Sequence, residues 1–429
     1  MRAALWFLGL FGVAVAIALF AGNNQGTITV YWPPYRVDLS LNLVVLVLAL
    51  FFLVLHVALR SLAALFAMPG HARSWRIQHQ ERAMHVALLD ALSHMMAGRF
   101  IRARKAAEVV LARESAMARS GETLAYSARL RALSHLLAAE SAQSLQDKAA
   151  REDHLRQSLE QASRHDAQET REGVQLRAAR WALEDHDAQC ALQWLNDLPQ
   201  GAARRTLALR LRLQAARMAH QTKLALETAR LLAKHRAFSE VAAPGILRSL
   251  ALDLVLTAYD PDQLQTVWSQ LEEAERLMPE VAIEASRRML TVGGDIELAR
   301  NWLLPVWDHM LAQPGALTEA QRISLIGALE SSFAVTSGTP EALWLTRIER
   351  AQMANPADPS LQYLAGMTCM RLQLWGKAQQ LLQQSLTRLQ DIDLKKNAWA
   401  ALAELADHRG DAAAAAQAWK SAAQAAASA

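Results

Sequence analysis

The stretch WAALAELADHRGDAAAAAQAWKSAA, Trp399 to Ala423, decides the fold because it reads as two helices joined by one tight turn. Alanine, leucine and glutamate are good helix formers, and Trp399 and Leu402 fall on one face of the first helix. Gly410 marks the turn, and Trp419 faces back from the second helix. The stretch therefore predicts an antiparallel helix pair.

Weaker copies of this pattern recur toward the N-terminus. They are AGRFIRARKAA at 97–107, HDAQCALQWL at 186–195, GGDIELARNWL at 293–303 and a segment at 365–385. The pattern resembles the tetratricopeptide repeat, in which small residues let paired helices approach and large ones contact the next pair. We expect an all-α protein with a tetratricopeptide-like α-solenoid at 85–429. The alternative is an irregular helical domain, because 201–280 lacks the repeat's anchor residues.

The N-terminal part contains two long segments without charge, at about 3–22 and 39–59. Each is long enough for a helix to cross about 30 Å of hydrocarbon. We expect a two-helix transmembrane hairpin at 1–66, with a short strand or turn between the spans, followed by a basic juxtamembrane linker or helix at 67–84. A cleaved signal peptide is the alternative for the first span.

The basic residues gather after the second span. The chain has a net charge of +4, yet residues 60–105 alone carry eight arginines and lysines against two acids. Positive flanks remain cytoplasmic, so the repeats are expected in the cytoplasm of a bacterial cell with a multi-pass inner-membrane anchor. This position favours binding to anionic lipid headgroups over binding to nucleic acid. The alternative is a solvated helix face without lipid specificity. The predicted membrane-surface residues are Arg60, Arg73, Arg76 and Arg82.

Almost the whole chain resembles the HemY family. The resemblance rests on the two apolar segments, on MPGHARSWRIQHQERAMHVALLDALSHMMAGRFIRARKAA at 68–107, on LLAAESAQ at 136–143 and on the C-terminal repeats. It implies a Gram-negative inner-membrane protein acting late in haem (porphyrin) biosynthesis. It does not imply the protoporphyrinogen oxidase that shares the name in Gram-positive bacteria, and it supplies no catalytic residues.

Motifs for catalysis are absent from the sequence. There is no dinucleotide fingerprint, P-loop or zinc-ligand spacing, and EDHDAQC at 184–190 falls at a repeat turn where polar residues are expected. We therefore expect no enzyme, no metal and no resident cofactor. Haem or porphyrin binding stays open, with His56 in the second span as its candidate ligand.

The surface formed by the first helix of each repeat is the better candidate site. Solenoids bind partners there, and methionine and aromatic side chains adapt to peptides. The repeat register assigns to it Tyr363, Met367, Met370, Arg371, Asn397 and Glu404. We expect a scaffold that binds haem-biosynthesis enzymes; a haem or porphyrin carrier and a general envelope-assembly adaptor are the alternatives.

Overall fold

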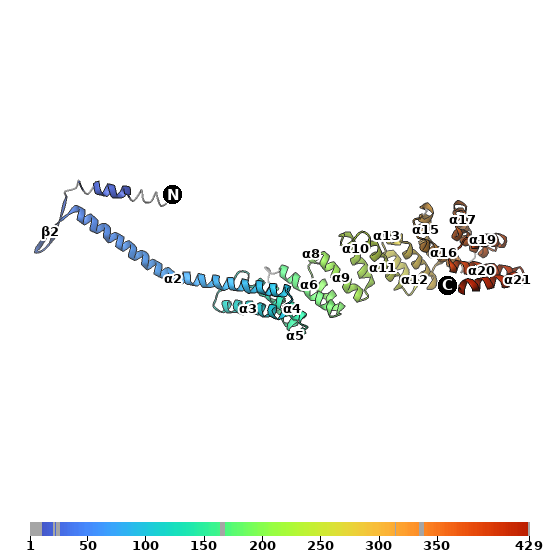
Figure 1. Ribbon diagram of the computed structural model, residues 1–429, viewed down its shortest axis with the longest axis horizontal. Helices are drawn as coiled ribbons and strands as arrows, with labels where there is room; N and C mark the ends of the chain where they lie inside the picture. Colours follow the sequence, from blue (N-terminus) through green and yellow to red (C-terminus); the bar gives the residue numbers. More distant parts are fainter. Residues whose placement is uncertain are drawn as a thin grey trace. The chain divides into compact units, whose positions relative to one another are not determined.

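The computed structural model describes residues 11–19, 22, 26–163, 168–313, 315–333 and 339–427 (Figure 1). The chain divides into two compact units, residues 1–168 and 169–429, which are considered one at a time. Apart from one β-hairpin, every regular element in the described ranges is a helix. The predicted all-α class is therefore confirmed.

The N-terminal unit begins with a short helix and a hairpin. Residues 11–19 are helical, and strands β1 (Thr27–Trp32) and β2 (Tyr35–Ser40) pair antiparallel, with Thr27 opposite Ser40. The sequence PP at 33–34 forms the turn between them. This hairpin is the short extended segment expected between the two predicted spans.

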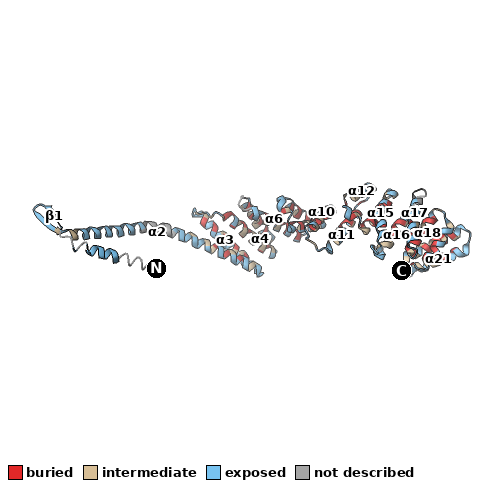
Figure 2. Ribbon diagram, turned by 90° about the horizontal axis from the view of Figure 1, so that it is seen from above, coloured by how far each residue is buried: buried red, intermediate tan, exposed pale blue. Residues whose placement is uncertain are grey.

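Helix α2 (Leu41–Met96) is a single helix of 56 residues. The Ser40 hydroxyl caps it by accepting a hydrogen bond from the Leu43 amide at 3.3 Å. Within the described residues, the segment Leu41–Ala63 is the one helix long and apolar enough to cross a membrane, and none of its residues is buried (Figure 2). The predicted span at 39–59 thus starts two residues too early, because residues 39 and 40 belong to β2.

The first predicted span, 3–22, falls largely outside the described residues, of which it contains only 11–19 and 22. The transmembrane hairpin with two helices therefore stays a prediction. The predicted linker at 67–84 is part of α2, which continues through it without a break.

The rest of the first unit consists of helices packed in sequence order. Helix α3 (Phe100–Arg119) packs on α2 and on α4 (Ser127–Ser144), which packs on α5 (Lys148–Ala162). Buried alanines lie where these helices meet, which permits close approach of their backbones. Larger buried side chains fill the remaining space: Met84, Val110, Met117 and Leu130.

The second unit contains the remaining helices. Their bounds are α6 (Gln168–Glu184), α7 (Ala188–Asn196), α8 (Gln200–Ala203), α9 (Thr206–Met218), α10 (Thr222–Lys234), α11 (Ala242–Leu256), α12 (Pro261–Gln270), α13 (Glu273–Arg276), α14 (Pro279–Thr291), α15 (Ile296–Ala312), α16 (Glu319–Phe333), α17 (Thr339–Ala354), α18 (Pro359–Arg371), α19 (Trp375–Leu386), α20 (Ile392–His408) and α21 (Ala412–Ala427). Each helix of a pair packs on its partner and on the next pair, as in a solenoid.

One backbone turn recurs between the helices of a pair. At Gly410, φ is +76°, and the next amide, Asp411, donates back to the Ala406 carbonyl at 3.0 Å. A residue in the left-handed conformation, followed by a hydrogen bond that closes a turn of six residues, is the Schellman motif. The same turn is built around Gly98, Gln146, His186, His220, Gly293 and Gln373. The repetition shows that the pairs in both units share one design, including pairs whose sequences lack a turn glycine.

Gly366 provides a test of the close approach between paired helices. A Cβ atom there would lie 2.8 Å from Cγ and 3.3 Å from the backbone nitrogen of Leu382 on α19. We expect Gly366→Val to destabilise the α18–α19 pair by about 1–3 kcal/mol through overpacking. Gly376→Val is the matched control, because nothing lies within 4 Å of its Cβ position. Hydrogen exchange of α18 and α19 measures the difference, and equal effects of the two variants would contradict the packing.

Candidate protein-binding site

The first helices of successive pairs in the second unit contact one another. Helix α14 contacts α16, α16 contacts α18, and α18 contacts α20. We call α14, α16, α18 and α20 the first-helix layer. It is the layer to which the repeat register assigned the candidate site residues.

The structure places the six predicted residues on two helices of this layer. Arg371 and Glu404 are exposed, while Met367 and Asn397 are half-buried. Tyr363 is 0% exposed and Met370 is 9% exposed, so the prediction that these two residues line an open surface is wrong. Their helix, α18, is covered by α16, α17, α19 and α20 on several sides, which a helical period read from sequence does not reveal.

A polar cluster lies around Glu330, a half-buried residue of α16. Tyr363 of α18 and Asn397 of α20 lie beside its carboxylate, and Arg371 acts on it electrostatically. Burial raises the pKa of Glu330, and Tyr363, Asn397 and Arg371 oppose that rise. We call Glu330, Tyr363, Arg371 and Asn397 the Glu330 cluster. Three of its four members were among the predicted residues.

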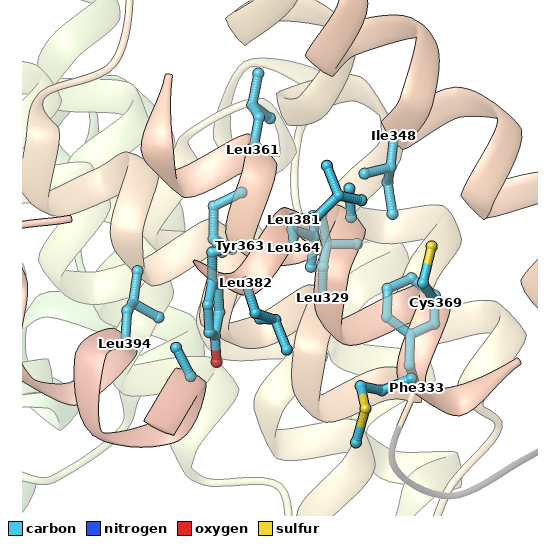
Figure 3. Packing of buried hydrophobic residues seen from close by; sticks show 14 of the residues in the cluster. Leu329, Phe333, Ile348, Leu361, Tyr363, Leu364, Cys369, Leu381, Leu382 and Leu394 are labelled. Carbon is cyan, nitrogen blue, oxygen red and sulfur yellow. The ribbon is translucent and has the colours of Figure 1, made fainter. Parts of the chain in front are cut away.

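The Tyr363 hydroxyl is the unusual group in this cluster. The ring packs among leucines of neighbouring helices, including Leu382 and Leu394, with its oxygen at the edge of the apolar core (Figure 3). Burial, followed by the Glu330 charge, raises the pKa of Tyr363, so the phenol is neutral. Its oxygen is shielded from solvent and lies beside the Glu330 carboxylate and the Asn397 amide, which are its hydrogen-bonding neighbours in the cluster.

Glu330 itself was missed at the sequence level. It follows the apolar run LIGAL at 325–329 on a helix with no repeat signature, and glutamate is common on exposed helix faces. The one signal in the sequence is its position directly after Leu329, the last residue of the apolar run. The structure shows that the Leu329 side chain is 0% exposed. Such a position borders the core, where a carboxylate is costly.

The Glu330 cluster gathers four kinds of polar group. It offers a carboxylate, a phenol, an amide and a guanidinium, which are hydrogen-bonding groups from three helices. The nearby Cys369 thiol is buried on α18, and burial raises its pKa to about 11, so it is protonated at neutral pH and a poor nucleophile. Among the described residues, no three histidine, cysteine or acidic side chains are placed to hold a metal ion.

The predicted membrane-surface arginines all lie on α2 and are exposed. Arg73 donates to the Glu122 carboxylate at 2.7 Å. Arg82 stands 19 residues after Ala63, about 29 Å further along the helix axis at 1.5 Å per residue. The role of these arginines at a membrane surface stays a prediction. His56 is exposed inside the apolar segment, and its role as a haem ligand stays a prediction.

A second buried polar contact belongs to the first unit. The Nδ1 atoms of His135 on α4 and His154 on α5 lie 3.1 Å apart, and His135 is 9% exposed. Burial, followed by the neighbouring His154, lowers the pKa of His135 to about 4. The His135 imidazole is therefore neutral at physiological pH, and sequence reasoning did not single out this contact between α4 and α5.

Comparison with known proteins gives one family match. Residues 26–146 match the family described as HemY protein N-terminus. No curated protein matches the chain. Among solved structures, it is similar to the APC/C hetero-tetramer Cut9-Hcn1, with 14% identity, a TM-score of 0.28 and coverage of 79% of this chain and 66% of that one.

Two further structures have comparable similarity. Naa15/Naa10 bound to HypK-THB gives 12% identity and a TM-score of 0.25, with 77% of this chain and 56% of that chain covered. The P58(IPK) TPR domain gives 12% identity and a TM-score of 0.22, with 76% of this chain and 99% of that chain covered. The chain thus spans less than two thirds of the first two structures. At these TM-scores the fold rests on the helix packing described above.

Proposed function

We propose, from the match of residues 26–146 to the HemY N-terminal family, that this chain is a membrane-anchored, non-enzymatic scaffold. Its proposed role is to bind or organise enzymes of a late step in haem biosynthesis. The observation that carries the scaffold proposal is the first-helix layer, in which three successive helices bring Glu330, Arg371 and Asn397 together. Solenoids use such stacked helices as extended protein-binding surfaces.

The membrane anchor gives this proposal its location. The apolar segment Leu41–Ala63 and the family match indicate association with a membrane. We propose an inner-membrane protein with two spans, whose basic residues after the second span keep the repeats in the cytoplasm. Anchoring the binding surface near the membrane raises its effective concentration for other proteins held there. Reporter fusions after residue 105 test the orientation, and periplasmic activity of the reporter would contradict it.

Site-directed crosslinking tests the scaffold function. A photo-crosslinking amino acid at Glu404, exposed on the first-helix layer, is expected to capture enzymes of haem biosynthesis in native membranes. The same amino acid at Lys420, exposed on the second helix α21, serves as the control. Mass spectrometry of the adducts gives the result. Equal capture from both positions, or adducts without any haem-synthesis enzyme, would contradict the proposal.

Arg371→Glu is the variant suited to a matching loss-of-function test. Arg371 is exposed, so its charge reversal changes the binding surface without removing core volume. Substitution of Tyr363 would confound the test, because that ring is wholly buried. We expect Arg371→Glu to reduce the Glu404 crosslink while the helical content stays unchanged.

A further inference from the structure

A cleft of about 630 Å³ opens in the second unit where the chain passes from one helix pair to the next. It lies between the α15–α16 connection, which contains Gly315 and Leu317, and the α17–α18 connection at 355–358. Its volume is in the range of pockets that enclose a ligand. The residues of the Glu330 cluster do not line this cleft, so the two sites are separate.

The apolar lining of the cleft is continuous with the core. Leu361 of α18 is 2% exposed and belongs to the hydrophobic cluster of the C-terminal helices. Three half-buried side chains of the lining pack against that cluster: Met310, Leu311 and Leu317. An apolar side chain that entered the cleft would leave water and extend this core, which favours binding.

The α17–α18 connection is held in place by hydrogen bonds. The Gln362 side chain donates to the Pro356 carbonyl at 2.7 Å, and the Asp358 amide donates to the Asn355 carbonyl at 3.1 Å. The Asp358 carboxylate accepts from the Ser360 amide at 2.9 Å through Oδ1 and so caps α18. These bonds fix one side of the cleft before a ligand arrives, which lowers the entropic cost of binding.

The charges that line the cleft are paired with each other. Arg322 and Asp358 are the charged residues among the described lining, and Nη1 of Arg322 donates to Oδ2 of Asp358 at 3.1 Å. Both Asp358 oxygens therefore already accept a hydrogen bond. The Arg322 side chain is 35% exposed, and its Nε–H has no acceptor among the residues that the structure describes. The cleft thus combines apolar surface with spare N–H donors and no net charge.

We propose that this cleft receives one neutral aliphatic side chain, of the size of leucine or methionine, from an extended segment of a partner protein. The proposal rests on the proposed scaffold function and gives that scaffold a ligand chemistry. The aliphatic side chain packs on Leu317 and Leu361, and a main-chain carbonyl of the same segment accepts from Arg322. A charged side chain is disfavoured, because it would lose its hydration in a cleft whose own charges are already paired.

Peptide binding to the full-length protein in nanodiscs of zwitterionic lipid tests this inference. The probes are nine-residue peptide libraries with a fixed central residue, which is leucine, glutamine, glutamate or lysine. We expect the leucine library to bind about tenfold more tightly than the glutamine library, the scale expected when an aliphatic side chain leaves water. The glutamate and lysine libraries should bind no better than the glutamine library.

Two variants show whether this preference comes from the cleft. Ala354→Phe adds a ring at an exposed position of the lining, and Leu317→Ser removes part of the apolar surface. Each should bring the ratio of leucine to glutamine affinity to near unity. The matched controls, Ala413→Phe on α21 and Leu343→Ser on α17, change exposed residues outside the lining and should leave the ratio unchanged. Circular dichroism and thermal unfolding show that each variant keeps its fold.

Each other outcome overturns the inference. It is wrong if no library is preferred, if the glutamate or lysine library binds best, or if the leucine preference persists in folded Ala354→Phe or Leu317→Ser protein. The scaffold function fails separately, through the Glu404 crosslinks. A leucine preference at the cleft without adducts of haem-synthesis enzymes would support the ligand chemistry and remove the pathway.

Discussion

Replacing Arg300 by alanine is expected to lower the free energy of unfolding of the surrounding helices by about 3–5 kcal/mol. Arg300 lies on α15 and is 0% exposed, one of the largest wholly buried side chains. Its guanidinium donates to the Ser332 carbonyl at 2.7 Å and to the Ser332 hydroxyl at 3.2 Å near the end of α16. It also lies 4.7 Å from the centroid of the Phe333 ring.

The size of this effect follows from what alanine leaves behind. The buried Ser332 carbonyl loses a charged donor, and the volume of a long side chain becomes a cavity. Arg300→Met keeps most of that volume, so it separates the packing loss from the hydrogen-bond loss and should cost less than alanine.

Hydrogen exchange of α15 and α16 in the full-length protein measures the loss. The matched control is Arg287→Ala, which removes an exposed arginine that also donates to a helix carbonyl, that of Ser324, at 3.1 Å. We expect the control to cost less than about 1 kcal/mol. An equal loss in the two variants would show that Arg300 does not support this part of the solenoid.

Acidification is expected to destabilise the pair of helices α4 and α5 by roughly 3 kcal/mol between pH 6.5 and pH 4. The pKa of His135 is lowered from 6.5 to about 4, mainly by burial and then by His154, with Arg131 in the same direction and Asp153 opposing. In this interval the unfolded chain binds a proton that the folded chain does not bind. The contribution of the neutral His135 to the free energy of unfolding is therefore complete above pH 6.5 and is lost as the pH falls toward 4.

Comparison with His135→Gln isolates this contribution from other groups. Glu114 on α3 also titrates abnormally, because burial raises its pKa against the effect of Arg131, and its effect has the opposite sign. The difference between wild type and His135→Gln removes that background. Exchange of α4 and α5 amides at pH 7 and pH 4.5 gives the measurement. Substitution of the exposed His79 by glutamine should leave the pH dependence of α4 and α5 stability as in the wild type. If the stability difference between wild type and His135→Gln were the same at both pH values, the buried neutral imidazole would be contradicted.

The sequence by itself determined the helical class, the paired design and the apolar segment of α2. These properties are local: period, small residues at helix crossings and runs without charge are readable from neighbouring residues. Where glycine occupies the left-handed turn position, as at Gly98, Gly293 and Gly410, the turns were also readable. Within 201–280, where the repeat pattern was weak, His220 adopts the same conformation without glycine.

Tertiary structure alone decided which faces of the helices are open. Tyr363 and Met370 fall on the predicted face of α18, but α16 and α20 cover it, so both residues are part of the core. Glu330 joined the site for the same reason, since only the packing of three helices brings it beside Tyr363 and Asn397. Helical period fixes the direction of a side chain about its own axis, whereas burial and charge pairing depend on residues far away in the chain.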